Sequence, residues 1–217
     1  MKKLLTTSLL LGAALLPMLQ GCLPMVAAGA AGGALATMDR RSLGIQTEDE
    51  TIEWKAVARV NEKSGDNSHT NFTSYNRKVL VTGEVPNEEL KATIERIVAG
   101  IPQVEGVYNE LVVGPVTSYS TRSNDSYITT RVKGRFVDSG NFNAVHVKVV
   151  TEAGVVYLLG LVTQREADSA IQVARTTSDV KKVVNLLEII PDAKARELEL
   201  TMPKASPQEP KPAANGG

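Results

Sequence analysis

The 217-residue sequence contains one cysteine, two histidines and few aromatic residues, which account for 4% of the chain. A single cysteine cannot form an internal disulfide, and its isolation excludes zinc ribbons, iron–sulfur sites and disulfide scaffolds. Basic and acidic side chains balance at 24 each, and the pI is near 6.8. Because no global field attracts a polyanion, we expect no nucleic-acid partner.

The N-terminus has the pattern of a secretory signal. Met1 is followed by two lysines, and an apolar run from Leu4 ends in Leu19-Gln-Gly-Cys22. This run is too short, with the wrong flanks, for a membrane span. The Leu-x-Gly-Cys ending resembles the lipobox of bacterial lipoproteins, which implies removal of residues 1–21 and acylation of Cys22, with palmitate among the acyl chains. The alternative is an ordinary signal peptide with an incidental cysteine.

Acylation decides how the protein would be anchored. Each buried methylene contributes about 0.8 kcal/mol, so one chain binds a membrane reversibly whereas two or three bind it almost permanently. Leu23 follows the cysteine, where lipoproteins retained at the inner membrane often carry Asp. The resemblance therefore implies a lipid anchor in the outer membrane, on its periplasmic face.

After removal of residues 1–21, both ends of the chain have too few large apolar residues to form a hydrophobic core. Residues 22–46 include a Gly/Ala-rich stretch at 26–36, which predicts a flexible linker, with a helix lying on the membrane as the alternative. Residues 194–217 include a proline-rich end, which predicts a disordered tail.

The chain between these ends is duplicated. Residues 79–85 match residues 156–162 at an offset of 77, and residues 104–111 match 180–187 at an offset of 76. With 42% apolar residues, the chain has enough core material for two small domains. We therefore predict one domain over 47–115 and a second over 116–193.

Each copy has the same predicted order of elements. Apolar periodicity predicts a helix, two strands, a second helix and a third strand. Thr163 and Glu166 form a predicted capping box at the start of the second helix in copy two. The fold class is α+β, with two helices on one face of a three-stranded mixed sheet. The predicted ranges are helices at 48–60 and 125–137, strands at 71–75, 78–85, 145–150 and 155–162, second helices from 87 and 163, and last strands at 107–113 and 183–190.

The repeated motifs resemble the BON domain. They are a strand ending in Val-x-x-Gly-x-Val, an alanine-spaced helix, and a strand entered through Val-x-x-Val-x-Asn. Copy two fits this pattern better than copy one. Its helix has alanines at 170 and 174, where copy one has Ile94 and Val98. Two such domains behind a lipobox resemble the dual-BON outer-membrane lipoproteins. The resemblance implies binding of anionic phospholipid, a role in outer-membrane integrity and, for the most similar members, enrichment at division sites.

Charge differs between the copies. Residues 48–115 carry seven basic and twelve acidic side chains, whereas residues 116–193 carry nine and eight. A basic side chain near an anionic leaflet contributes about 1 kcal/mol within a Debye length of about 8–10 Å. Only the second copy gains from this attraction, so phosphatidylglycerol and cardiolipin are the expected lipid partners.

The predicted lipid contact lies on the first helix of copy two. Tyr127, Arg131 and Arg135 are spaced four residues apart, and Lys133 adds a further positive charge. A tyrosine ring suits the headgroup layer and guanidinium groups pair with phosphate. From composition alone, a solvated helix face is the alternative.

Several residues are assigned structural roles. Gly83 and Gly160 indicate close helix approach or an irregular strand, and Asn109 and Asn185 are expected to bond backbone at a strand entry. Trp54 is expected to pack between the copies or on its own sheet.

No catalytic pattern involves the two histidines. His69 and His146 belong to no Ser-His-Asp or His-x-x-x-His arrangement. We expect no enzymatic activity, no cofactor and no metal site. The competing hypothesis is an envelope scaffold that binds other proteins through the acidic first copy, and a membrane-damaging toxin has little support.

Overall fold

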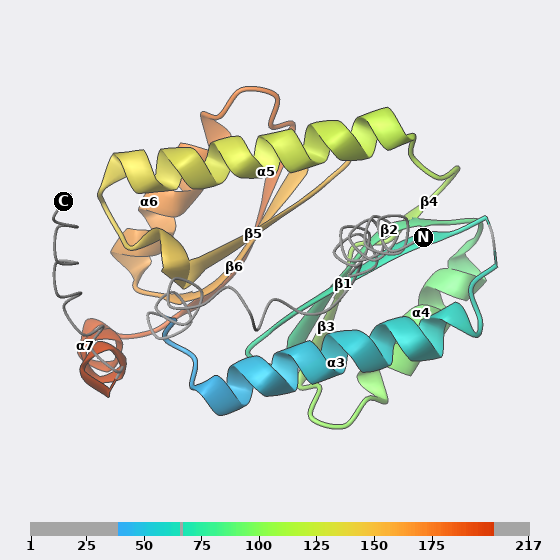
Figure 1. Ribbon diagram of the computed structural model, residues 1–217, viewed down its shortest axis with the longest axis horizontal. Helices are drawn as coiled ribbons and strands as arrows, with labels where there is room; N and C mark the ends of the chain where they lie inside the picture. The colour runs from blue at the N-terminus through green and yellow to red at the C-terminus, as the bar shows by residue number, and fades with distance from the viewer. Residues whose placement is uncertain (1–38, 66, 202–217) are drawn as a thin grey trace, which may run out of the picture. The chain divides into compact units, whose positions relative to one another are not determined.

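The computed structural model describes residues 39–65 and 67–201 (Figure 1). Both copies fall within one compact unit. The predicted signal peptide, Cys22, most of the predicted linker and residues 202–217 lie outside the described residues.

The first copy follows the predicted order of elements. Strand β1 pairs antiparallel with β2, which in turn pairs in parallel with β3 and β4. These last two are segments of the single strand predicted over 107–113, separated at the buried Leu111. The elements are α3 (Leu43–Asn61), β1 (His69–Tyr75), β2 (Lys78–Val85), α4 (Glu88–Ala99), β3 (Gly106–Asn109) and β4 (Val112–Val113).

The second copy repeats this arrangement in a three-stranded sheet with the order β5-β6-β7. The strand predicted from residue 145 begins at Val147, because residues 144–146 form a short 3-10 helix in which Asn143 Oδ1 accepts from the Val145 amide at 3.1 Å. The elements are α5 (Tyr119–Ser139), η2 (Ala144–His146), β5 (Val147–Glu152), β6 (Val155–Val162), α6 (Gln164–Arg175) and β7 (Lys182–Ile189). The predicted α+β fold with mixed sheets is confirmed.

Each sheet is covered on one face by its own two helices (Figure 1). Ile52, Ala56 and Val60 of α3 are fully buried in the first core, as their spacing predicts. Their counterparts in α5 are Ile128, Val132 and Phe136, also fully buried. In α6, three alanines provide the flat surface that lets the helix approach its sheet closely.

The other faces of the two sheets contribute to a third apolar cluster, formed by Tyr75, Leu80, Tyr157 and Leu159. This packing buries β2 and β6 on both faces and explains their apolar runs at 79–81 and 155–159, since strands buried on both faces lose the alternation of a half-exposed sheet. Ion pairs join the copies around the cluster, from Lys78 to Glu188 at 2.6 Å and from Lys148 to Glu53 at 3.1 Å.

The predicted flexible linker and disordered tail are wrong for the residues that the structure describes. Helix α3 begins at Leu43, where Ser42 Oγ accepts from the Ile45 amide, so residues 39–46 are ordered. The tail forms helix α7 (Asp192–Thr201), which buries Ala195. Both segments are polar and short of apolar residues, and long-range ion pairs hold them, which composition does not reveal.

A buried aspartate fixes the first hairpin of each copy. Asp49 accepts hydrogen bonds from the amides of Asn76 and Arg77, both at 2.8 Å. Asp125, seventy-six residues later, accepts from the amides of Ala153 and Gly154. Both two-residue turns have positive φ, which is the type I′ geometry favoured in hairpins. The repeat offset aligns the two aspartates and is the signal that identifies them.

The repeated glycines allow close approach of strands. A Cβ on Gly83 would lie 2.0 Å from the His69 carbonyl oxygen, and one on Gly160 would lie 2.3 Å from that of His146. Gly83 also has φ of +117°, an irregular conformation within β2. The close neighbour is therefore the adjoining backbone and not a helix.

The repeated asparagines bond the backbone as expected, but Asn109 ends β3 and Asn185 lies within β7, so neither is at a strand entry. Asn109 Oδ1 accepts from the Leu111 amide at 3.4 Å, and Asn185 Oδ1 accepts from the Leu187 amide at 3.0 Å. In contrast, Trp54 packs neither between the copies nor on its sheet. It is 65% exposed, because it lies opposite the face of α3 that carries Ile52 and Ala56.

Candidate functional site

Helix α5 presents an exposed apolar ridge opposite its core face. Tyr119, Tyr127 and Val137 are 85%, 58% and 69% exposed. Residues 119 and 137 are about 27 Å apart along an ideal helix. Exposed aromatic and aliphatic side chains on one long helix are suited to a partner that covers the whole ridge.

The structure brings two of the predicted contact residues together. The guanidinium carbon of Arg131 lies 5.4 Å from the ring centroid of Tyr127. Arg131 Nη1 also pairs with Asp179 Oδ2 at 2.8 Å. Both partners are partly exposed, so this pair contributes about 1 kcal/mol or less and another anion can replace the carboxylate.

Arg135 does not continue the row. Its Nη1 donates to the Val173 carbonyl oxygen at 3.0 Å and to Thr177 Oγ1 at 2.9 Å, and its Nη2 donates to Thr176 Oγ1 at 3.1 Å. These acceptors lie at the C-terminal end of α6. A step of four residues turns a helix by about 40° beyond a full turn, so two such steps rotate Arg135 from the outer surface toward α6.

Lys133 is exposed, but it lies on the other flank of the ridge. Two residues correspond to about 200° of rotation, which separates Lys133 from Arg131 around the helix. The predicted stripe is therefore a ridge with Arg131 on one side and Lys133 on the other.

Sequence reasoning missed the N-terminal part of this surface. The predicted helix began at residue 125, whereas α5 begins at Tyr119 after the N-cap Ser118. The guanidinium carbon of Arg122 lies 4.3 Å from the Tyr119 ring centroid, which repeats the Tyr–Arg pairing seen with Arg131. Ser118 in front of this segment is the signal of the earlier helix start.

A buried ion-pair cluster joins the N-terminal segment to the second copy and to α7. Arg40 is 4% exposed and makes two hydrogen bonds to Glu166, at 2.7 and 2.9 Å. It also donates to the Leu161 carbonyl oxygen at 2.9 Å and to Glu199 at 2.6 Å. The predicted capping box is present, with Thr163 and Glu166 bonding each other's backbone. Glu166 thus serves the helix cap and Arg40 together.

The cluster shifts the pKa values of its members. Burial acts to raise the pKa of Glu166, but hydrogen bonds from Arg40 and the Thr163 amide outweigh it and lower the pKa to about 2. His146 Nδ1 lies 4.0 Å from Glu166 Oε1. Burial, followed by the charge of Arg40, lowers the pKa of His146. The histidine is therefore neutral at neutral pH.

Metal binding and membrane spanning find no support in the described part of the chain. No group of three His, Cys, Asp or Glu side chains there could hold a metal ion. Among residues 39–65 and 67–201, no helix is long and apolar enough to cross a bilayer.

Comparison with known proteins identifies the repeated unit. The BON domain model matches residues 48–115 and 124–191. The chain belongs to the BON-domain family. It is 40% identical over 186 residues to "Outer membrane lipoprotein DolP" of Haemophilus influenzae, covering 84% of this chain and 95% of that protein. It is 32% identical over 155 residues to a "21 kDa hemolysin" of Actinobacillus pleuropneumoniae, covering 70% and 80%.

These matches extend over both BON domains and almost the whole of the first relative. The prediction of a dual BON-domain lipoprotein, lipid-anchored in the outer membrane, is confirmed. In this family context, the α5 ridge belongs to the second BON domain, and the acidic α3 belongs to the first.

Proposed function

We propose that this protein is a non-enzymatic, lipid-anchored envelope protein at the periplasmic face of the outer membrane. Its second BON domain binds anionic phospholipid, phosphatidylglycerol or cardiolipin, through the outer face of α5. By holding the folded domains against the bilayer, this contact supports outer-membrane integrity, including at the division site. The proposal assigns Tyr127, Arg131 and Lys133 to lipid contact and Arg135 to positioning.

The observation that carries this proposal is the exposed ridge of Tyr119, Tyr127 and Val137 flanked by Arg131 and Lys133. Tyrosine suits the boundary between headgroups and acyl chains because its ring is apolar and its hydroxyl is polar. Long basic side chains reach phosphate while their stems cover apolar surface. The ridge therefore has the chemistry of a helix that lies along a membrane surface.

Of the two basic residues beside the ridge, only Arg131 has an ion pair that lipid binding would break. Arg131 would exchange Asp179 for a lipid phosphate, at a cost no greater than that of an exposed ion pair. Lys133 makes no ion pair within the described residues and adds its charge directly. The first domain, with five more acidic than basic side chains, gains nothing from an anionic leaflet.

The test is vesicle flotation of the chain from residue 23 to 217, which lacks the acylated cysteine. We expect binding to phosphatidylglycerol or cardiolipin vesicles that weakens with salt and is absent with phosphatidylcholine vesicles. Lys133→Glu should weaken binding by about 2 kcal/mol, or about thirtyfold. Lys63→Glu makes the same change at an exposed lysine of the first domain and should have little effect. Equal binding by both variants would reject the α5 assignment.

A second candidate function is an envelope scaffold that uses the first domain. Trp54 and Val57 are exposed on the outer face of α3, at positions where the second domain has Thr130 and Lys133. An exposed tryptophan is typical of protein interfaces. Crosslinking in membranes, compared between the wild type and Trp54→Ala, would show whether a protein partner depends on this face.

A further inference from the structure

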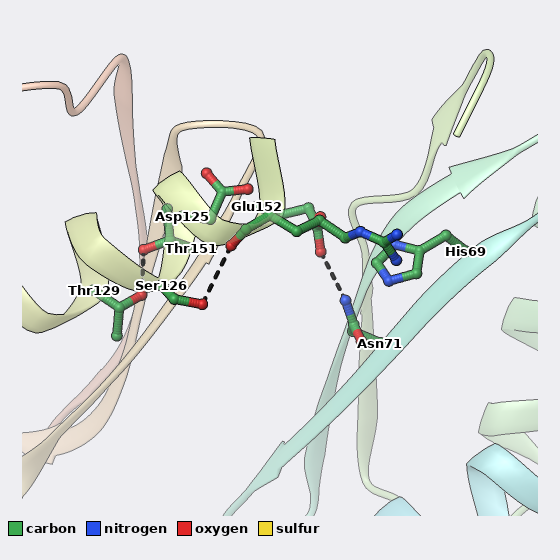
Figure 2. A pocket seen from close by; sticks show the side chains of 8 residues that line it. His69, Asn71, Asp125, Ser126, Thr129, Thr151 and Glu152 are labelled. Carbon is green, nitrogen blue, oxygen red and sulfur yellow. Dashed lines mark hydrogen bonds between the residues drawn. The ribbon is translucent and has the colours of Figure 1, made fainter. Parts of the chain in front are cut away.

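A polar cavity of about 400 Å³ lies between β1 of the first domain and α5 with β5 of the second (Figure 2). His69 and Asn71 come from β1, Arg122 and Ser126 from α5, and Glu152 from β5. All the side chains that line it are polar or charged. The cavity therefore differs in kind from the apolar clusters that stabilise each domain, and imperfect core packing does not account for it.

Arg122 is the cationic side chain of this cavity. Arg122 forms no ion pair with any residue that the structure describes, and its buried Nε has no hydrogen-bond partner there. The Nδ1 atom of His69 makes no hydrogen bond either, but Glu84 Oε2 lies 3.6 Å from it. Buried polar nitrogen atoms are nearly always hydrogen-bonded in native proteins, so the unpaired Arg122 Nε indicates a place for an acceptor.

The anionic side chains of the cavity are Asp125 and Glu152. Glu152 Oε2 accepts from Asn71 Nδ2 at 2.9 Å and from Thr82 Oγ1 at 3.1 Å, and the first of these bonds is drawn in Figure 2. Both bonds reach the same oxygen, which leaves Oε1 as an acceptor. Asp125 differs, since each of its oxygens accepts a backbone amide of the hairpin turn.

Arg122 and Glu152 thus present opposite charges to one cavity without pairing with each other. A simple anion would be attracted by Arg122 and repelled by the carboxylates, and a simple cation would meet the reverse. A ligand that carries both charges can pair with Arg122 and with Glu152, and it leaves neither charge unpaired when water is displaced.

We propose that this cavity binds a small zwitterion whose phosphate pairs with Arg122 and whose primary ammonium pairs with Glu152. Phosphoethanolamine has this chemistry, either free or as the headgroup of a phospholipid. Arg122 also lies against Tyr119 at the N-terminal end of the α5 ridge, whereas Glu152 belongs to β5, so the Glu152 contact is the part of this proposal that is independent of the ridge.

The test is an NMR titration of the chain from residue 23 to 217 with phosphoethanolamine. We expect amide shifts at β1, the first turns of α5 and the end of β5. Phosphoethanolamine should bind more tightly than ethanolamine or inorganic phosphate alone. Phosphocholine, whose ammonium has no N–H donor, should bind more weakly. Arg122→Gln should raise Kd about tenfold or more, because it removes a charge-assisted contact.

Two further variants make the result specific. Glu152→Gln should reduce the preference for phosphoethanolamine over inorganic phosphate. Because Glu152 also bonds two neighbours, its variant is interpreted only alongside Arg122→Gln, which breaks no ion pair within the described residues. Arg175→Gln makes the same charge change at an exposed site on α6 and should leave Kd unchanged.

Vesicles distinguish the two sources of the ligand. Contact with phosphatidylethanolamine vesicles that depends on Arg122, without binding of free phosphoethanolamine, assigns the cavity to the lipid headgroup. Binding of both assigns it to the shared chemistry. If neither interaction depends on Arg122, the proposal is wrong. Lys133→Glu separates this result from the proposed function, since it should weaken only the binding of anionic vesicles.

Discussion

Replacing Arg40 by methionine should destabilise the protein and release α7. Methionine keeps much of the apolar stem but leaves Glu166 buried without its cationic partner. Breaking a buried ion pair from one side costs about 3–5 kcal/mol. The lowered pKa of Glu166, from 4.5 to about 2, corresponds to about 3 kcal/mol, which Arg40 and the hydrogen bonds of Thr163 contribute together.

The contact of Arg40 with Glu199 adds less, because 44% of the Glu199 side chain is exposed. Such a pair contributes about 1 kcal/mol at most. The expected loss of about 3–5 kcal/mol is a large part of the about 5–15 kcal/mol that stabilises a typical domain. Loss of the Glu199 contact should also detach α7, whose other anchor is the single buried Ala195.

Urea unfolding followed by circular dichroism measures the first effect, and amide hydrogen exchange in α7 measures the second. Arg196→Met makes the same replacement at an exposed position on α7 and should change stability by less than about 0.5 kcal/mol. If Arg40→Met loses no more stability than this control and α7 stays protected from exchange, the buried pair does not hold the N-terminal segment.

Three other perturbations test the same scaffold. His146 has a lowered pKa when folded, so stability should fall as pH drops below about 6.5, and His146→Gln should flatten this pH dependence in urea unfolding. Glu166 changes the stability only at lower pH, because its stabilising contribution is lost as pH falls from 4.5 toward about 2. Asp125→Asn weakens two turn bonds and should cost about 1–3 kcal/mol by urea unfolding, whereas no loss would contradict its role in the hairpin. Gly160→Ala places a Cβ 2.3 Å from a carbonyl oxygen and should lower Tm, while Gly134→Ala, with open space in α5, should raise it. Equal effects of the two alanines would contradict the close strand approach.

The repeated α+β units could be predicted because their information is local. Apolar spacing in the helices and continuous apolar strands are read directly from the chain, and the duplication checks each assignment against its copy. The early starts of α3 and α5 escaped prediction because their first turns lack the apolar spacing of the core face. Their caps, Ser42 and Ser118, are the local signals that remain.

The contacts between distant segments could not be predicted in the same way. Arg40 and Glu166 are 126 residues apart, and nothing near either residue specifies the other. The predicted lipid-binding row failed at Arg135 for a different reason. Its spacing placed it beside Arg131, but the end of α6 supplies three acceptors that draw its guanidinium inward. Sequence spacing locates a residue on a helix, whereas neighbouring elements decide where a long side chain ends.

Comparison of the two domains separates scaffold from surface. Residues that stabilise the fold are the same in both copies. They are Asp49 with Asp125, Gly83 with Gly160, and Asn109 with Asn185. The outer faces of the first helices differ, since Thr51, Trp54 and Val57 correspond to Tyr127, Thr130 and Lys133. A surface that only had to be soluble would need neither an exposed tryptophan on one copy nor a tyrosine flanked by cations on the other. The duplicated fold therefore presents two chemically distinct helical faces, and a function for either domain is to be sought on its own first helix.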